Sequence, residues 1–100
     1  MYKLVFLEQA SADIDHYAEK IFEYTEHRSS VKVFLDSIKF TCDQIVAFPY
    51  SCPVYQPVRP LDFEFRVKAF GNYNLFYIVN EADETIVIAR IILTKSEERP

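Results

Sequence analysis

The sequence predicts an α+β domain in two layers, with the element order strand, helix, helix and then three strands. Two observations carry this prediction: apolar residues recur at helical spacing before Pro49 and alternate with polar residues after Leu61. The chain has 100 residues, of which 50% are hydrophobic, enough for one small core. We therefore expect a single domain, residues 1–100, in which an N-terminal helical hairpin packs on one face of a four-stranded, mainly antiparallel sheet.

The first strand is expected at Tyr2 to Leu7, where the sequence reads YKLVFL. A helix follows from about residue 10 to 26, because apolar residues there recur every three or four positions. Ser11 and Asp13 stand where such a helix could be capped, and Asp13 is assigned to the solvent side of the helix.

A second helix is expected after the short connector His27 to Ser30, with Ser29 or Ser30 as its cap. Its end is set by Pro49, since the residue before a proline avoids the helical region. So short a connector predicts an antiparallel helical hairpin. The loop from Pro49 to Pro60 holds four of the five prolines, so it is expected to be stiff, either closing the core or serving function.

The second half of the chain is typical of an antiparallel meander. From Phe63 to Ala69 apolar residues alternate with charged ones, which predicts a strand that buries Phe63 and Ala69 and turns Arg66 to its polar face. The turn dipeptide Gly71-Asn72 leads to a strand at Tyr73 to Val79, and the polar turn 81–84 leads to a strand at 85–93. The first strand can lie beside the last and complete the sheet.

The last two strands are apolar on both faces, whereas an antiparallel sheet with one wet face should alternate. The second face therefore needs a cover, which could be the C-terminal tail, a partner chain or both. Arg90 is the one charged residue within the last strand. Period-two spacing assigns it to the same face as Ile86, Ile88 and Ile92.

Charge and composition exclude several classes of protein. The formal net charge of −4 argues against broad, non-specific binding of nucleic acid. No apolar stretch is long enough for a transmembrane helix, and a cytoplasmic protein without membrane contact is expected. Cys42 and Cys52 alone make neither a disulfide framework nor a metal site, and no cofactor is expected.

Several stretches together resemble the RelE/ParE superfamily of bacterial type II toxins. They are the N-terminal YKLVFLEQASADIDHYAEKIFEY, the proline that ends the second helix, and FRVKAFGNYNLFYIV followed by IVIARIIL. The resemblance implies a small toxin that is neutralised by an extended segment of a cognate antitoxin, in a toxin–antitoxin hetero-oligomer. Such a segment would fit the second apolar face. The antitoxin-binding candidates are Tyr73, Tyr77, Ile88 and Arg90.

The same resemblance leaves the mode of action open. RelE-type members cleave mRNA on the ribosome with a set of basic residues and a tyrosine in the tail. Leu93 stands here where many members have a histidine, Lys95 where they have an arginine, and no tyrosine follows Tyr77. ParE-type members poison DNA gyrase and need no such set. Gyrase binding is therefore favoured, with an endoribonuclease or a degenerate, antitoxin-binding member as the alternatives.

If the protein is an endoribonuclease, the candidate catalytic residues are Arg66, Arg90 and Lys95, which could stabilise charge at a phosphate. Arg66 and Arg90 could point into one groove of the meander and bind phosphate or carboxylate in bidentate fashion. The alternative is that each arginine pairs with Glu64, with Glu84 or with an antitoxin carboxylate.

Overall fold

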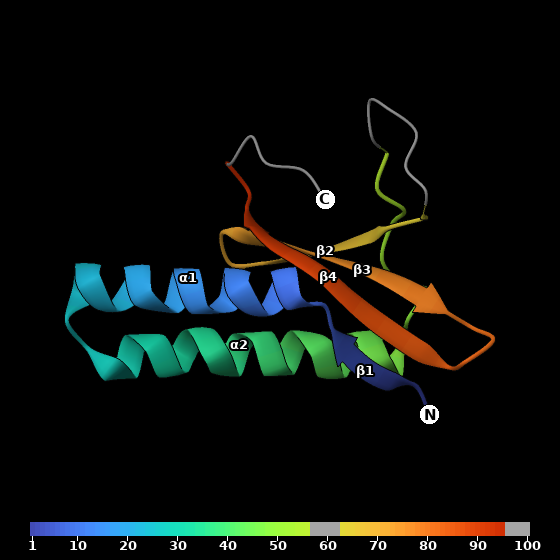
Figure 1. Ribbon diagram of the computed structural model, residues 1–100, viewed down its shortest axis with the longest axis horizontal. Helices are drawn as coiled ribbons and strands as arrows, with labels where there is room; N and C mark the ends of the chain where they lie inside the picture. The colour runs from blue at the N-terminus through green and yellow to red at the C-terminus, as the bar shows by residue number, and fades with distance from the viewer. Residues whose placement is uncertain (57–62, 96–100) are drawn as a thin grey trace.

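The computed structural model describes residues 1–56 and 63–95 and has the predicted α+β architecture, with two helices on a four-stranded sheet (Figure 1). Residues 57–60 of the proline-rich loop and the tail from 96 onward lie outside the described residues. The elements in chain order are β1 (Lys3–Phe6), α1 (Glu8–Thr25), α2 (Arg28–Ala47), β2 (Arg66–Phe70), β3 (Tyr73–Asn80) and β4 (Thr85–Leu93).

The strand order in the sheet is β1-β4-β3-β2. Strands β2, β3 and β4 form the predicted antiparallel meander, and β1 lies beside β4 in parallel orientation. Both expectations about the sheet are therefore confirmed. No helix of the described part of the chain is long and apolar enough to cross a membrane.

The core lies between the sheet and the hairpin of α1 and α2, whose tip extends past the end of the sheet (Figure 1). Its most deeply buried side chains come from the second helix and from the two central strands. They are Ile45, Leu75, Tyr77, Ile86, Ile88 and Ile91. Burial of this kind contributes about 25 cal/mol per Å² of apolar surface and holds the two layers together.

Both predicted helix caps are wrong. Helix α1 begins at Glu8 with Leu7 as its N-cap, so Asp13 lies inside the helix, in its second turn. Helix α2 begins at Arg28 with His27 as its N-cap. Helix α1 begins earlier than predicted because a single residue, Leu7, connects it to β1. The Leu7 N–H donates to the carbonyl of Ile88 in β4, and the Leu7 carbonyl accepts the first hydrogen bond of the helix.

The predicted buried face of β2 is also wrong. Phe63 is 63% exposed and precedes the strand, and Ala69 is exposed within it. Arg66 pairs with the fully buried Tyr77, and paired residues of an antiparallel ladder share a face. Arg66 therefore lies on the face of the sheet that the helices cover. This is possible because β2 is an edge strand, from which a long side chain can extend past the rim of the core to solvent.

A β-bulge in β4 overturns part of the predicted orientation of Arg90. Arg90 pairs with Phe76 and Ile88 pairs with Tyr77, so Ala89 is an extra residue without a partner on β3. The insertion reverses the alternation of side chains along the strand. Arg90 therefore lies on the opposite face from Ile86 and Ile88, contrary to the prediction, and on the same face as Ile92, as predicted.

The second face of the sheet is partly covered by the chain itself. Phe76 and Ile92 on that face are 5% and 2% exposed. The ring of Tyr55, from the loop after α2, packs edge-on against Phe76 with 5.1 Å between the ring centroids. The loop after α2 thus covers part of the second apolar face that the sequence pattern predicted.

The turn between β2 and β3 provides a test of backbone strain. Gly71 has a φ of +53°, and no atom lies within 4 Å of the position that a Cβ would take. We expect Gly71→Val to lower the free energy of unfolding by about 1–2 kcal/mol, because L-residues are strained in this region. Gly71→Asn should cost much less, since asparagine tolerates it. Urea unfolding checks both variants, and equal losses would contradict the strain argument.

Candidate functional site

The carboxylate of Asp13 joins α1 to β4. It accepts two hydrogen bonds from the Arg90 guanidinium, from Nε at 2.8 Å and from Nη2 at 3.1 Å, and a third from the Ile91 backbone N–H at 3.0 Å. The side chains of Asp13 and Arg90 are only 9% and 19% exposed. Asp13 is therefore a buried structural anion, and its assignment to the solvent side of the helix was wrong.

Tyr17 repeats this contact one helical turn later, where its hydroxyl accepts a hydrogen bond from the Leu93 N–H at 3.2 Å. Ile91 and Leu93 are alternate residues on one edge of β4, about 6.8 Å apart along a strand. Residues four apart on a helix rise about 6.0 Å, so the two spacings nearly match. Helix α1 thus takes the place of β1 along the second half of β4.

Arg66 is bound to the segment that follows α2. Its Nη1 donates to the Cys52 carbonyl at 2.7 Å, and its guanidinium lies 5.0 Å from the centre of the Tyr50 ring. The Arg66 side chain, 17% exposed, also forms an ion pair with Glu64 at 3.7 Å, one of the pairings expected from the sequence. Arg66 therefore holds the loop against the sheet edge.

Tyr77 and Ile88, two of the predicted antitoxin contacts, are fully buried on the helix side of the sheet. The Tyr77 hydroxyl donates to the Pro49 carbonyl at 2.7 Å, and burial raises the pKa of its phenol. The phenol is therefore a neutral donor that fixes the end of α2. In this conformation neither side chain is accessible to a partner.

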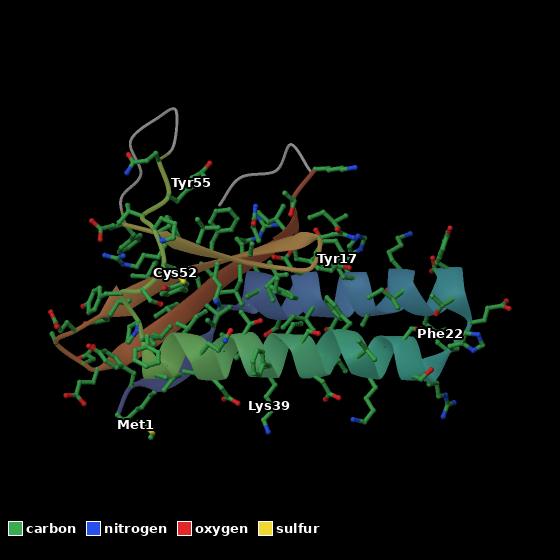
Figure 2. All side chains as sticks on the ribbon, turned by 180° about the vertical axis from the view of Figure 1, so that it is seen from behind. Met1, Tyr17, Phe22, Lys39, Cys52 and Tyr55 are labelled. Atoms are coloured by element: carbon green, nitrogen blue, oxygen red, sulfur yellow. The ribbon has the colours of Figure 1, made fainter. Side chains whose placement is uncertain are left out.

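Tyr73 is the predicted contact that borders an open surface. Its ring lies 5.1 Å from those of Tyr17 and Phe34, and burial raises the pKa of its phenol. A groove of about 670 Å³ opens here between α1 and the sheet, at the place where Figure 2 labels Tyr17. This α1 groove is lined by His16, Tyr17, Lys20, Ile21, Glu23, Tyr24, Thr25, Tyr73 and Leu93.

A second groove, of about 490 Å³, lies between α2 and the edge strand β2. It is more polar and carries two exposed apolar side chains of α2, Val33 and Phe40, which are 65% and 64% exposed. We call it the α2 groove. The α1 groove is the better candidate for a long apolar ligand, because it is larger and its walls are mostly aromatic and aliphatic.

Two of the three predicted catalytic cations, Arg66 and Arg90, are held by different parts of the fold. Arg66 and Arg90 lie on strands that flank β3 and are bound to the Cys52 carbonyl and to the Asp13 carboxylate. Lys95 is exposed just after β4. Among the described residues, no three His, Cys, Asp or Glu side chains gather into a group that could hold a metal ion.

The comparisons with known proteins agree with this architecture. The family model described as the ParE toxin of the type II toxin–antitoxin system parDE matches residues 4–97. A comparison with curated proteins gives no match.

Solved structures with the same fold include toxins of both branches of the superfamily. The chromosomal ParDE system from P. aeruginosa superposes with a TM-score of 0.75 at 15% identity, covering 95% of this chain and 98% of that one. The RelBE2 complex from Mycobacterium tuberculosis gives 0.62 at 17% identity, covering 92% and 96%. The isolated E. coli RelE toxin gives 0.59 at 13% identity, covering 98% and 89%.

The Asp13–Arg90 contact can be tested against an exposed ion pair of the same chain. We expect Asp13→Ala to lower the free energy of unfolding by about 3–5 kcal/mol, because it leaves a largely buried guanidinium and a strand N–H without their acceptor. The matched control is Asp36→Ala, which removes the exposed pair with Lys32 at 2.8 Å. Denaturant unfolding should show a far smaller loss for the control, and similar losses would contradict the structural role of Asp13.

Proposed function

The chain belongs to the ParE toxin family of type II toxin–antitoxin systems, and from this we propose that it arrests growth by binding DNA gyrase and is neutralised by a cognate antitoxin. The observation that supports binding over RNA cleavage is that two of its three candidate catalytic cations are already bound within the fold. The guanidinium groups of Arg66 and Arg90 are both held by acceptors within the fold.

RNA cleavage without a metal needs a general base for the ribose 2′-hydroxyl and cations that meet the charge developing on the phosphate. Lys95 is exposed, whereas Arg66 and Arg90 would have to leave their partners to reach a phosphate. Leu93 stands where a histidine would supply a base. A protein that works by binding needs none of these groups, so gyrase inhibition fits this chain better.

The α1 groove is proposed as a place where the antitoxin binds. Two of the solved structures with this fold, from M. tuberculosis and Pyrococcus horikoshii, are complexes of a RelE-type toxin with its RelB partner. An amphipathic segment binds a groove through apolar side chains on one face, and the tyrosine-rich α1 groove suits such a segment. Tyr73 and the 92% exposed Tyr24 are the proposed contacts, in a toxin–antitoxin hetero-oligomer.

The mode of action can be tested by inducing the toxin in cells and mapping the ends of mRNA, together with a gyrase supercoiling assay on purified protein. We expect inhibited supercoiling and intact message. The informative variant is Lys95→Ala rather than an arginine variant, because Arg66 and Arg90 also stabilise the fold. Lys39→Ala, on the exposed face of α2 (Figure 2), is its control.

Cuts in translated message that fall about 10²–10³-fold with Lys95→Ala and persist with Lys39→Ala would establish the ribonuclease instead. Growth arrest without either effect would exclude both activities. Full growth with antitoxin still bound would identify a degenerate member of the family.

Antitoxin binding in the α1 groove can be tested with two exposed aromatic residues. We expect Tyr24→Ala to weaken the complex with the antitoxin about tenfold or more, as loss of a large aromatic contact does at interface hot spots. Phe40→Ala, in the α2 groove, is the matched control and should change the affinity little. Isothermal titration calorimetry measures both, and a larger loss for Phe40→Ala would assign the antitoxin to the α2 groove.

A further inference from the structure

The two edges of the sheet differ in how they are protected. At the β2 edge, the Val67 N–H donates to the Pro53 carbonyl at 3.1 Å, and the Tyr55 N–H donates to the Phe65 carbonyl at 2.7 Å. The segment around Pro53 therefore covers the beginning of that edge. Strand β1 forms the other edge, and within the described residues it pairs with β4 alone.

The hydrogen bonds of β1 show which of its residues face outward. The N–H groups of Lys3 and Leu7 donate to the Glu84 and Ile88 carbonyls at 2.8 and 3.0 Å. Because alternate residues of a strand bond to opposite sides, Val5 also faces β4 while Leu4 and Phe6 direct their N–H and C=O groups outward. No hydrogen bond within the described part of the chain reaches these four groups.

The side chains along this edge are apolar and accessible. Val5, Phe6 and Leu7 are 46%, 38% and 43% exposed. Proteins normally protect an edge strand by keeping it short or with charged residues, proline or a bulge. Strand β1 is short and begins with Lys3, but residues 4–7 carry no charge, proline or bulge. An unpaired, apolar edge of this kind is a template for another strand.

We propose that a second copy of this chain pairs with β1, in antiparallel orientation about a two-fold axis at Val5. In this register Leu4 stands opposite Phe6 of the second copy, and the outward groups of both strands form complementary pairs. Lys3 stands opposite Leu7 of the second copy, so no like charges face each other. The β1 edge is self-complementary in this way, and the result is a continuous sheet through both copies.

The size of this contact sets its strength. Strand β1 has only four residues, so the interface falls in the small class that is typical of weak, transient association. The dimer should therefore form in a concentration-dependent manner. This inference concerns the free toxin and holds whether or not gyrase is its target.

Sedimentation equilibrium on the purified toxin, over a concentration series, tests the association. We expect a monomer–dimer equilibrium that Val5→Lys weakens about tenfold or more, because it places two like charges directly opposite each other. Val33→Lys is the matched control, because it makes the same substitution at a 65% exposed valine on α2. Its equilibrium should match that of the unchanged chain.

Amide hydrogen exchange on the unchanged chain gives a test that needs no variant. We expect the Leu4 and Phe6 amides to become protected as the concentration rises, while those of Lys3 and Val5, already bonded to β4, stay protected throughout. A monomer at every concentration, or an equal effect of Val33→Lys, would overturn the proposal. So would protection of Leu4 and Phe6 only on addition of antitoxin, which would assign this edge to the antitoxin.

Discussion

The rest of the structure depends on one carboxylate, that of Asp13. Strand β1 is too short to accompany β4 along its length, since its last residue, Phe6, is paired with Ile88. Beyond that point β4 would expose backbone N–H groups, and an unpaired buried donor costs about 1–3 kcal/mol. Asp13 and then Tyr17 accept those donors, which fixes the angle at which α1 leaves the sheet.

The same contact explains why a buried guanidinium is tolerated in β4. The bulge at Ala89 changes which N–H groups face α1 and brings Arg90 beside Asp13. A buried charge is acceptable only when it is paired and its hydrogen bonds are satisfied, as here. A residue that looks like a phosphate ligand in the sequence is therefore part of the framework, and the same holds for Arg66 at the other edge.

Local patterns predicted most of the fold. Helical spacing predicted both helices, and Pro49 predicted the end of α2 to within two residues. The dipeptide Gly71-Asn72 predicted the turn between β2 and β3. The sequence did not predict the bulge or the Asp13–Arg90 pair, because each depends on residues about 14 or 77 positions apart. One signal was available: Asp13 lies four residues before Tyr17, on the face that α1 buries, and a carboxylate there requires a cation.

The pairing of β1 with β4 has a consequence for synthesis of the protein. Lys3 is paired with Thr85, so β1 cannot form its hydrogen bonds in the sheet until β4 has been synthesised. Contacts this distant in sequence slow folding, because the loop between them must close first. A nascent chain released before β4 emerges would lack the partner of both β1 and Asp13. The sheet can therefore be completed only after translation has passed β4.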